Sequence, residues 1–388
     1  MNKLKLSKIW FVLIFCAVLF LPLFASSNKA FATGDEEIKI SSKSAVLVDY
    51  NSGTVIFQKN ADERLPIASM TKLASLSVIF EFLNKGIIKE SDLVTVSENA
   101  ASVGGSSAFL DAGSKYKVSD LIKTIVIASA NDSTVALAEF IAGSEESFVL
   151  KMNKMASSLG LKDTNFANST GLPTENHYST ANDMVKIYKS VCNNALYKKD
   201  SKIWMEDFIH PSGRKTGLVN TNRLIKTFDG IDGGKTGYTD KAKFCLTASA
   251  TRGDTRLIGV VIGAEDSKTR FSEMSKLFNY GFANYENKLL IDSEVPVTVC
   301  KFKNSKNTIS AFPEKSINKF LNKSEEFVFS TDFEIHQTKA PVKQGAVIGK
   351  MFVFDKNNMV IDEVNLIAGD DAKEIGFKES FEKVIFNW

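Results

Sequence analysis

Three short motifs, far apart along the chain, constrain the fold more than any other feature of the sequence. They are Ser69-Met70-Thr71-Lys72, Ser129-Ala130-Asn131 and Lys235-Thr236-Gly237. Each string alone is weak evidence, because a serine can cap a helix and K-T-G can form an exposed turn. Together they supply a nucleophile, a base, a proton-relay pair and a group that binds an anion. A fold that uses all of these groups must bring three distant segments to one cleft.

The order of the predicted elements indicates an α+β fold, an antiparallel sheet with packed helices. In chain order we expect a hairpin at 44–58, helices that begin near residues 69, 119 and 135, a strand meander at 231–264 and a helix at 267–285. The meander contains the third motif, and the first two motifs lie at a helix start and a helix end. Helices between an early hairpin and a late meander predict one sheet with helices packed against it.

The character of the chain changes near Lys288. Short β-rich runs separated by polar turns follow, which predicts a small C-terminal all-β domain, with a sandwich as one form. We therefore divide the chain into a leader at 1–32, a catalytic domain at 33–288, the β domain at 289–372 and a C-terminal segment at 373–388.

The first 32 residues are typical of a secretory signal peptide. A basic start is followed by an apolar run from Ile9 to Ala25, and Ala30-Phe31-Ala32 forms an A-x-A cleavage site. An uncleaved anchor is the alternative, because the apolar run is slightly long. Both readings predict that the bulk of the chain is exported.

Charge and cysteine content exclude several other classes of function. The net charge is +3, and four lysines lie in the first 32 residues, so the remainder carries −1 and we expect no nucleic-acid partner. Without the leader, Cys192, Cys245 and Cys300 remain, too few for a disulfide framework; the last two lie in apolar runs and are expected to be buried. The three histidines are scattered, so we expect no metal site and no cofactor.

The last residues form an amphipathic pattern. Phe377, Phe381, Val384, Ile385 and Trp388 recur at helical spacing among charged residues. This predicts a helix that lies on a membrane surface, here the outer face of the cytoplasmic membrane. A terminal helix docked on the β domain is the alternative.

The chemistry of the motifs follows from their residue types. Ser69 and Lys72 lie three apart on one helix face, and a serine hydroxyl needs such a base to become a nucleophile. Lys72 must be neutral to accept a proton, and burial together with the charge of Lys235 would lower its pKa. Ser129 can relay a proton to a leaving amine, and the Asn131 amide can hold a peptide group of the substrate.

The third motif suits the other end of a substrate. Lys235 and Thr236 offer a charge and a hydroxyl to a carboxylate. Gly237 would let the strand approach a substrate backbone, and the N–H of Tyr238 is a candidate second oxyanion donor. A second K-T-G at residues 215–217 follows a loop signal, and we prefer Lys235 because it opens the strand meander.

The motifs resemble those of the penicillin-binding D-alanyl-D-alanine carboxypeptidases, low-molecular-mass serine peptidases that trim peptidoglycan. The resemblance covers residues 40–285 and, more loosely, the β-rich region and the tail. Further similar segments are 45–53, 66–72, 105–107, 169–173, 177–181 and 232–239. The middle motif has Ala130 where the family commonly has glycine.

This resemblance implies a β-lactamase/transpeptidase-like fold and a role for each motif residue. Ser69 would be the acylated nucleophile and Lys72 its base. Ser129 and Asn131 would be the relay and the substrate-amide contact. Lys235, Thr236 and Arg270 would lie at the substrate carboxylate. The expected ligands are the peptidoglycan stem peptide and β-lactam antibiotics.

Two other functions remain as alternatives at this point. A β-lactamase would need fast deacylation, and no E-x-x-L-N string lies between Asn131 and Lys235. An inactive wall-binding protein would not need both Ser69 and Lys72. We therefore expect a D-alanyl-D-alanine carboxypeptidase with a long-lived β-lactam adduct.

Overall fold

The computed structural model describes residues 38–376. The predicted signal peptide and the predicted amphipathic helix from Phe377 onward lie outside these residues. Among the described residues, no helix combines the length and apolar character needed to cross a membrane.

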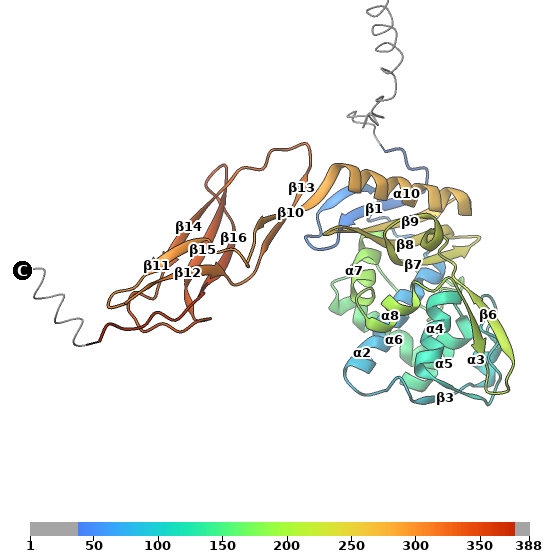
Figure 1. The fold of residues 1–388 in the computed structure, drawn as a ribbon. Coiled ribbons are helices and arrows are strands. Elements are labelled where there is room, and N and C mark those ends of the chain that lie inside the picture. Colours follow the sequence, from blue (N-terminus) through green and yellow to red (C-terminus); the bar gives the residue numbers. More distant parts are fainter. Residues whose placement is uncertain (1–37, 377–388) are drawn as a thin grey trace, which may run out of the picture. The chain divides into compact units, whose positions relative to one another are not determined.

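The catalytic part is built on a five-stranded antiparallel sheet with the strand order β2-β1-β9-β8-β7 (Figure 1). Its strands are β1 (Ser44–Asp49), β2 (Val55–Lys59), β7 (Ile231–Thr239), β8 (Lys243–Arg252) and β9 (Thr255–Ala264). Strand β1 is buried along its whole length, because helices cover both faces of the sheet at its centre. Strand β7 is an edge strand, so one side of its backbone is left unpaired within the sheet. The predicted hairpin and meander are both confirmed.

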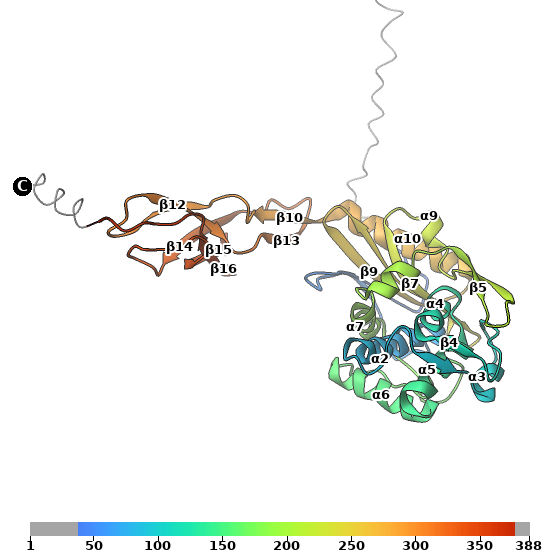
Figure 2. The same ribbon diagram turned by 60° about the horizontal axis from the view of Figure 1, so that its bottom comes forward.

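Helix α10 (Ser267–Asn284) packs on one face of this sheet, and most of the other helices gather on the opposite face (Figures 1 and 2). Glycines allow the close approach of α10. A Cβ at Gly259 would lie 2.5 Å from the Met274 sulfur, and one at Gly281 would lie 2.5 Å from Leu257 Cδ1. The predicted antiparallel sheet with packed helices is therefore the fold of this part.

The helical layer surrounds one hydrophobic core that includes residues from α2, α4, α5, α6 and α7. Its elements are η1 (Ala68–Thr71), α2 (Lys72–Asn84), α3 (Glu98–Ser102), α4 (Val118–Ala128), α5 (Asn131–Ala142), α6 (Glu145–Ser158), α7 (Ala181–Val191), α8 (Ala195–Asp200) and α9 (Leu224–Thr227). Two small antiparallel two-stranded sheets complete it, β3 (Leu93–Thr95) with β4 (Lys115–Lys117) and the hairpin of β5 (Met205–Ile209) with β6 (Lys215–Val219).

One helix start was predicted wrongly. Helix α5 begins at Asn131 rather than near Val135. The polar run from Asn131 to Thr134 reads as a loop, but these four residues are all buried and their side chains form hydrogen bonds. Tertiary contacts therefore override the local preference of these residue types.

The β-rich part has its own hydrophobic core. It contains a two-stranded ribbon of β10 (Tyr285–Ile291) and β13 (Ile317–Asn322), and one five-stranded sheet in the order β11-β12-β16-β15-β14. The strands of that sheet are β11 (Thr298–Lys301), β12 (Thr308–Pro313), β14 (Phe329–Ile335), β15 (Val347–Asp355) and β16 (Val360–Ala368). An all-β C-terminal part is confirmed, built as one larger sheet and a ribbon.

The predicted boundaries of this C-terminal part do not coincide with the ends of its β structure. The limit between residues 288 and 289 falls inside β10, because the sequence gives no break between α10 and that strand. At the other end, Glu374 forms an isolated bridge with Ser305, two residues beyond the predicted limit at residue 372.

Candidate active site

Ser69 and Lys72 lie together at the start of the first long helix. Ser69 is half-buried in the short turn η1, and Lys72 is the first residue of α2 and fully buried. The Lys72 Nζ lies 3.0 Å from Ser69 Oγ and donates to the Thr170 carbonyl at 2.8 Å. Burial, and then the nearby charge of Lys235, holds the pKa of Lys72 well below its ordinary value, while Asp132 opposes this shift. The geometry thus provides an amine beside the hydroxyl and a cause for its being neutral.

Residues 169–173 form the wall behind this pair. Gly171 has a φ of +84°, and a Cβ there would lie 2.0 Å from the Ala68 carbonyl oxygen. The same loop supplies the Thr170 carbonyl to Lys72. The resemblance marked this segment without giving it a task; the structure shows that it supports η1 and orients the lysine.

Thr71 and His177 form hydrogen bonds that stabilise the turn η1. The Thr71 hydroxyl donates to the Ala68 carbonyl at 2.8 Å and lies 2.7 Å from His177 Nε2. Because His177 Nδ1 accepts the Ala167 N–H at 3.1 Å, the hydrogen of the neutral ring belongs on Nε2 and is donated to Thr71. Burial lowers the pKa of His177 to about 4, so the ring stays neutral.

This histidine predicts a pH dependence of stability. Its pKa is lowered in the folded state, so the unfolded chain takes up the proton first as the pH falls. The stabilisation is complete above pH 6.5 and is lost as the pH falls toward 4, by about 3 kcal/mol in total. Urea unfolding at pH 7 and pH 4.5 should show a smaller difference for His177→Gln than for the wild type. His336→Gln, at an exposed position, is the control and should behave as the wild type.

Ser129 and Lys235 form the second pair. Ser129 ends α4 in the left-handed region, with a φ of 62°, and its hydroxyl accepts the Lys235 ammonium at 2.8 Å. Lys235 is almost fully buried, and it also donates to the Thr236 carbonyl at 3.0 Å. Burial, with the charge of Arg270, lowers the pKa of Lys235 to about 7. The second and third motifs therefore meet at one point, as a shared cleft requires.

Asn131 is oriented by a neighbouring loop. Its Nδ2 donates to the Gly104 carbonyl at 2.6 Å, and its backbone N–H donates to the Ser106 carbonyl at 2.7 Å. The side-chain Oδ1 is buried and has no hydrogen-bond partner among the described residues. Asn131 therefore offers an acceptor that a ligand N–H could satisfy.

Strand β7 carries Thr236, Gly237 and Tyr238 on the open edge of the sheet, packed against η1. The Thr236 hydroxyl donates to the Thr221 hydroxyl at 2.7 Å, and the Tyr238 hydroxyl donates to Asp240. A Cβ at Gly237 would lie 2.7 Å from the Ile67 carbonyl oxygen. This glycine is thus required for packing against the turn that carries Ser69, a reason that the sequence did not reveal.

Arg270 lies on α10 and is buried. Its Nη1 donates to the carbonyls of Gly237 and Cys245, each at 3.3 Å, and its guanidinium lies over the ring of Phe271. It contacts the backbone of β7 and lowers the pKa of Lys235 through its charge. It therefore supports the strand that carries the third motif.

The other sequence strings take structural places. The second K-T-G lies in β6, where the Thr216 hydroxyl bonds with His210 Nε2 at 2.8 Å, so the preference for Lys235 agrees with the geometry. Cys245 and Cys300 are buried free thiols, as predicted, and so is Cys192. Sequence reasoning gave no task to Thr170, His177 or Thr221. The first two lay in segments marked by the resemblance, but nothing in the sequence singled out Thr221.

A serine beside a buried, neutralised lysine, with a second buried lysine and an open strand edge, defines a serine enzyme of the acyl-transfer type. Residues 29–266 match the family model described as D-alanyl-D-alanine carboxypeptidase, and residues 285–374 match that of the penicillin-binding protein 5 C-terminal domain.

The similar proteins agree along most of the chain. D-alanyl-D-alanine carboxypeptidase DacF of Bacillus subtilis is 40% identical over 373 residues, covering 94% of this chain and 96% of the relative. DacC of Escherichia coli is 34% identical over 373 residues, covering 92% and 91%. The crystal structure of penicillin binding protein 5 from Haemophilus influenzae is 32% identical, with a TM-score of 0.68, and covers 88% of this chain and 100% of that chain. The chain therefore belongs to the D-alanyl-D-alanine carboxypeptidase family of serine peptidases, the family that the motifs predicted.

Proposed function

We propose that the protein removes the terminal D-alanine from peptidoglycan stem peptides through an acyl-enzyme on Ser69. The observation that carries this proposal is the 3.0 Å contact between Lys72 Nζ and Ser69 Oγ in a setting that lowers the pKa of the amine. The names of the relatives, which are D-alanyl-D-alanine carboxypeptidases, support the choice of substrate. β-Lactams would acylate the same serine, because they too present an amide carbonyl close to a carboxylate.

In acylation, neutral Lys72 takes the Ser69 proton while the oxygen attacks the carbonyl carbon of the penultimate residue. The N–H groups of Ser69 and Tyr238 are the proposed donors to the oxyanion. The C–N bond then breaks, and the leaving D-alanine amine receives its proton through Ser129, which Lys235 contacts. Water hydrolyses the ester and returns Ser69.

The substrate would lie along β7 as an added strand, since this strand is the open edge beside η1. Its terminal carboxylate would be held by Lys235 and Thr236, with Arg270 adding positive charge behind them. Asn131 would bond a substrate amide. A cavity of about 240 Å³, lined in part by Ile67, Ala68 and Thr239, adjoins η1 and offers room for the acyl side.

Export and membrane attachment belong to the same proposal. A stem peptide lies outside the cytoplasm, which agrees with a secretory leader at residues 1–32, and residues 377–388 would attach the protein reversibly to the membrane surface. Flotation with anionic vesicles should require residues 377–388; equal flotation of a chain ending at Gly376 would contradict the anchor.

We place the change of domain at Tyr285, where β10 begins.

The test of the function combines labelling with product release. Incubation with a labelled penicillin should add one adduct, located on Ser69 by peptide mass analysis and absent from Ser69→Ala. The wild type should release D-alanine from a pentapeptide. Fast turnover of nitrocefin would favour a β-lactamase instead, and a wild type that takes up no label would overturn the proposal.

A further inference from the structure

The carboxylate of Asp132 is an unusual group to find directly beside the active-site amide. Asp132 follows Asn131 in the first turn of α5, and it is fully buried. Among the described residues it forms no ion pair with a lysine or arginine. A buried carboxylate is costly unless hydrogen bonds satisfy it, so its bonds show what it is there to hold.

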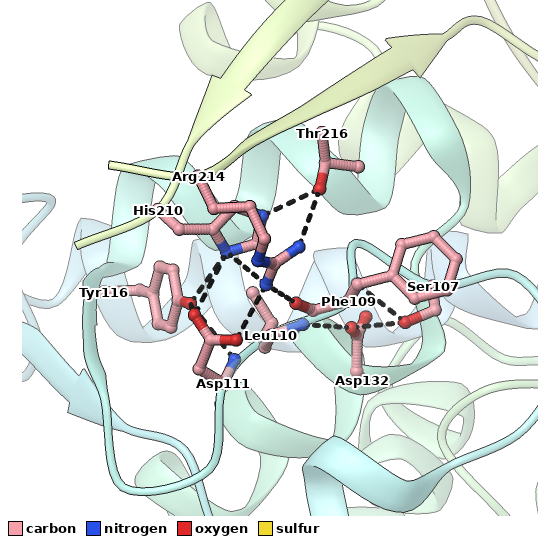
Figure 3. A network of polar contacts seen from close by, with 9 residues as sticks. All are labelled: Ser107, Phe109, Leu110, Asp111, Tyr116, Asp132, His210, Arg214 and Thr216. Atoms are coloured by element: carbon pink, nitrogen blue, oxygen red, sulfur yellow. Dashed lines mark hydrogen bonds and ion pairs between the residues drawn. The ribbon is translucent and has the colours of Figure 1, made fainter. Parts of the chain in front are cut away.

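Three of the four hydrogen bonds to Asp132 come from the loop formed by residues 104–111. Oδ2 accepts the Ser107 hydroxyl at 2.6 Å and the Leu110 N–H at 3.1 Å, while Oδ1 accepts the Ala108 N–H at 3.1 Å. The fourth donor is the neighbouring Ser133 N–H at 2.8 Å. Figure 3 shows Asp132 with Ser107 and Leu110 directed toward it. The Asp132 carboxylate therefore binds two backbone N–H groups and one side-chain hydroxyl of the loop.

The other side of the 104–111 loop is tied to the β5–β6 hairpin. The Arg214 guanidinium donates to the Phe109 carbonyl and to Asp111 Oδ1, the latter at 2.8 Å (Figure 3). Phe109 has a φ of 58° and its side chain is 64% exposed. A phenylalanine in the left-handed region is strained, and such strain persists only where the surroundings impose it. The loop is thus held in one shape from both sides.

The N-terminal end of this loop orients Asn131. Gly104 and Ser106 supply the carbonyls that accept the Asn131 side-chain and backbone N–H groups. With Nδ2 committed to Gly104, the unpartnered Oδ1 has a fixed direction. Release of the loop would let the amide rotate without touching Ser69, Lys72 or Lys235.

We propose that Asp132 is a positioning residue for acylation: its carboxylate holds the 104–111 loop, and through that loop it fixes the amide of Asn131 that binds the amide of the ligand. This rests on the proposed function. Arg214 supports the same loop from the opposite side. Asp132 acts on the ligand amide through Asn131 without contacting the ligand. Its charge also raises the pKa of Lys72, an effect that any two penicillins would share.

Two penicillins that differ at one group can separate this role from general damage. Benzylpenicillin carries an acylamido side chain, whereas 6-aminopenicillanic acid has the same nucleus and carboxylate without that amide. If Asp132 works through Asn131, then loosening the loop should slow acylation by benzylpenicillin more than acylation by 6-aminopenicillanic acid. A fall of about fivefold or more in the ratio of the two second-order rate constants is expected, the size of one net hydrogen bond.

The variants are Ser107→Ala, which removes one donor to Asp132, and Asp132→Asn, each measured in the full chain. Ser102→Ala is the matched control, because this exposed serine lies two residues before the loop and bonds to Asn99 within α3. It should leave both rate constants within about twofold of the wild type, since single exposed bonds contribute little. Thermal unfolding checks that each variant is folded; if Asp132→Asn is not, Arg214→Gln takes its place with the same expected ratio.

The outcomes are distinct. An equal fall in the rate constants for both penicillins overturns the positioning role. So does an unchanged ratio of the two rate constants in Ser107→Ala and in the second variant. A wild type that neither penicillin acylates shows instead that the proposed function is wrong, because the comparison then has no baseline.

Discussion

Replacing Lys72 by arginine should reduce acylation of Ser69 by about a thousandfold, the range in which a general base contributes to catalysis. The guanidinium can still donate to the Thr170 carbonyl, the contact that the lysine makes at 2.8 Å. It stays protonated at any accessible pH, so it cannot take the proton from the Ser69 hydroxyl. Stopped-flow measurement of the acylation rate constant with a fluorescent penicillin checks this.

A conservative change on the same helix serves as the control. Lys85 lies at the end of α2, is exposed and pairs with Glu81. Lys85→Arg should therefore keep the wild-type rate, because exposed ion pairs contribute little. If Lys72→Arg retained more than a tenth of the wild-type rate constant while remaining folded, Lys72 would not be the base.

Replacing Gly171 by alanine should destabilise the protein by at least about 3 kcal/mol, combining left-handed strain with overpacking. The φ of +84° strains any residue with a Cβ, and that Cβ would lie 2.0 Å from the Ala68 carbonyl oxygen, a backbone atom that cannot turn aside. Either the 169–173 loop or η1 must then move. Because the loop also supplies the Thr170 carbonyl to Lys72, acylation should fall together with stability.

Gly213 provides a control for the strain alone. Its φ is +83°, nearly that of Gly171, but a Cβ there would meet nothing within 4 Å. Gly213→Ala should cost about 1 kcal/mol in the free energy of urea unfolding, the effect of the left-handed backbone without a clash. Equal losses for the two variants would show that the predicted collision with Ala68 is relieved at no cost.

Much of the fold follows from the sequence because its signals are local. The hairpin, the first long helix and the meander all have regular apolar periods and clear turns, and the structure contains each of them. Residues 131–134 misled the prediction, because their polarity is satisfied by partners such as Ser107 and Gly104 that lie more than twenty residues away. Periodicity cannot reveal long-range hydrogen bonds of this kind.

The roles of the site residues likewise divide into those that the sequence predicts and those that only the folded chain reveals. The motifs predict a lysine neutralised by burial and by a second cation, and the structure gives Lys72 both causes. The sequence predicts that Gly237 leaves room for a substrate, and the structure adds a second reason for glycine, because a Cβ there would lie 2.7 Å from the Ile67 carbonyl oxygen and 3.2 Å from the Met70 nitrogen. The hydrogen bond between the Thr236 and Thr221 hydroxyls joins the third motif to a residue that no sequence pattern marks. Roles that depend on which backbone lies opposite a residue become visible only once the chain is folded.

The turn that carries Ser69 is clamped between two glycines, Gly171 on one side and Gly237 on the other, with backbone in direct contact at both. Neither position has room for a larger residue, so we expect no substitutions that alter drug sensitivity at these two glycines. The 104–111 loop orients Asn131, and some of its positions, such as Ser106 and Phe109, are exposed. Substitutions that reduce acylation by β-lactams should therefore arise first in that loop.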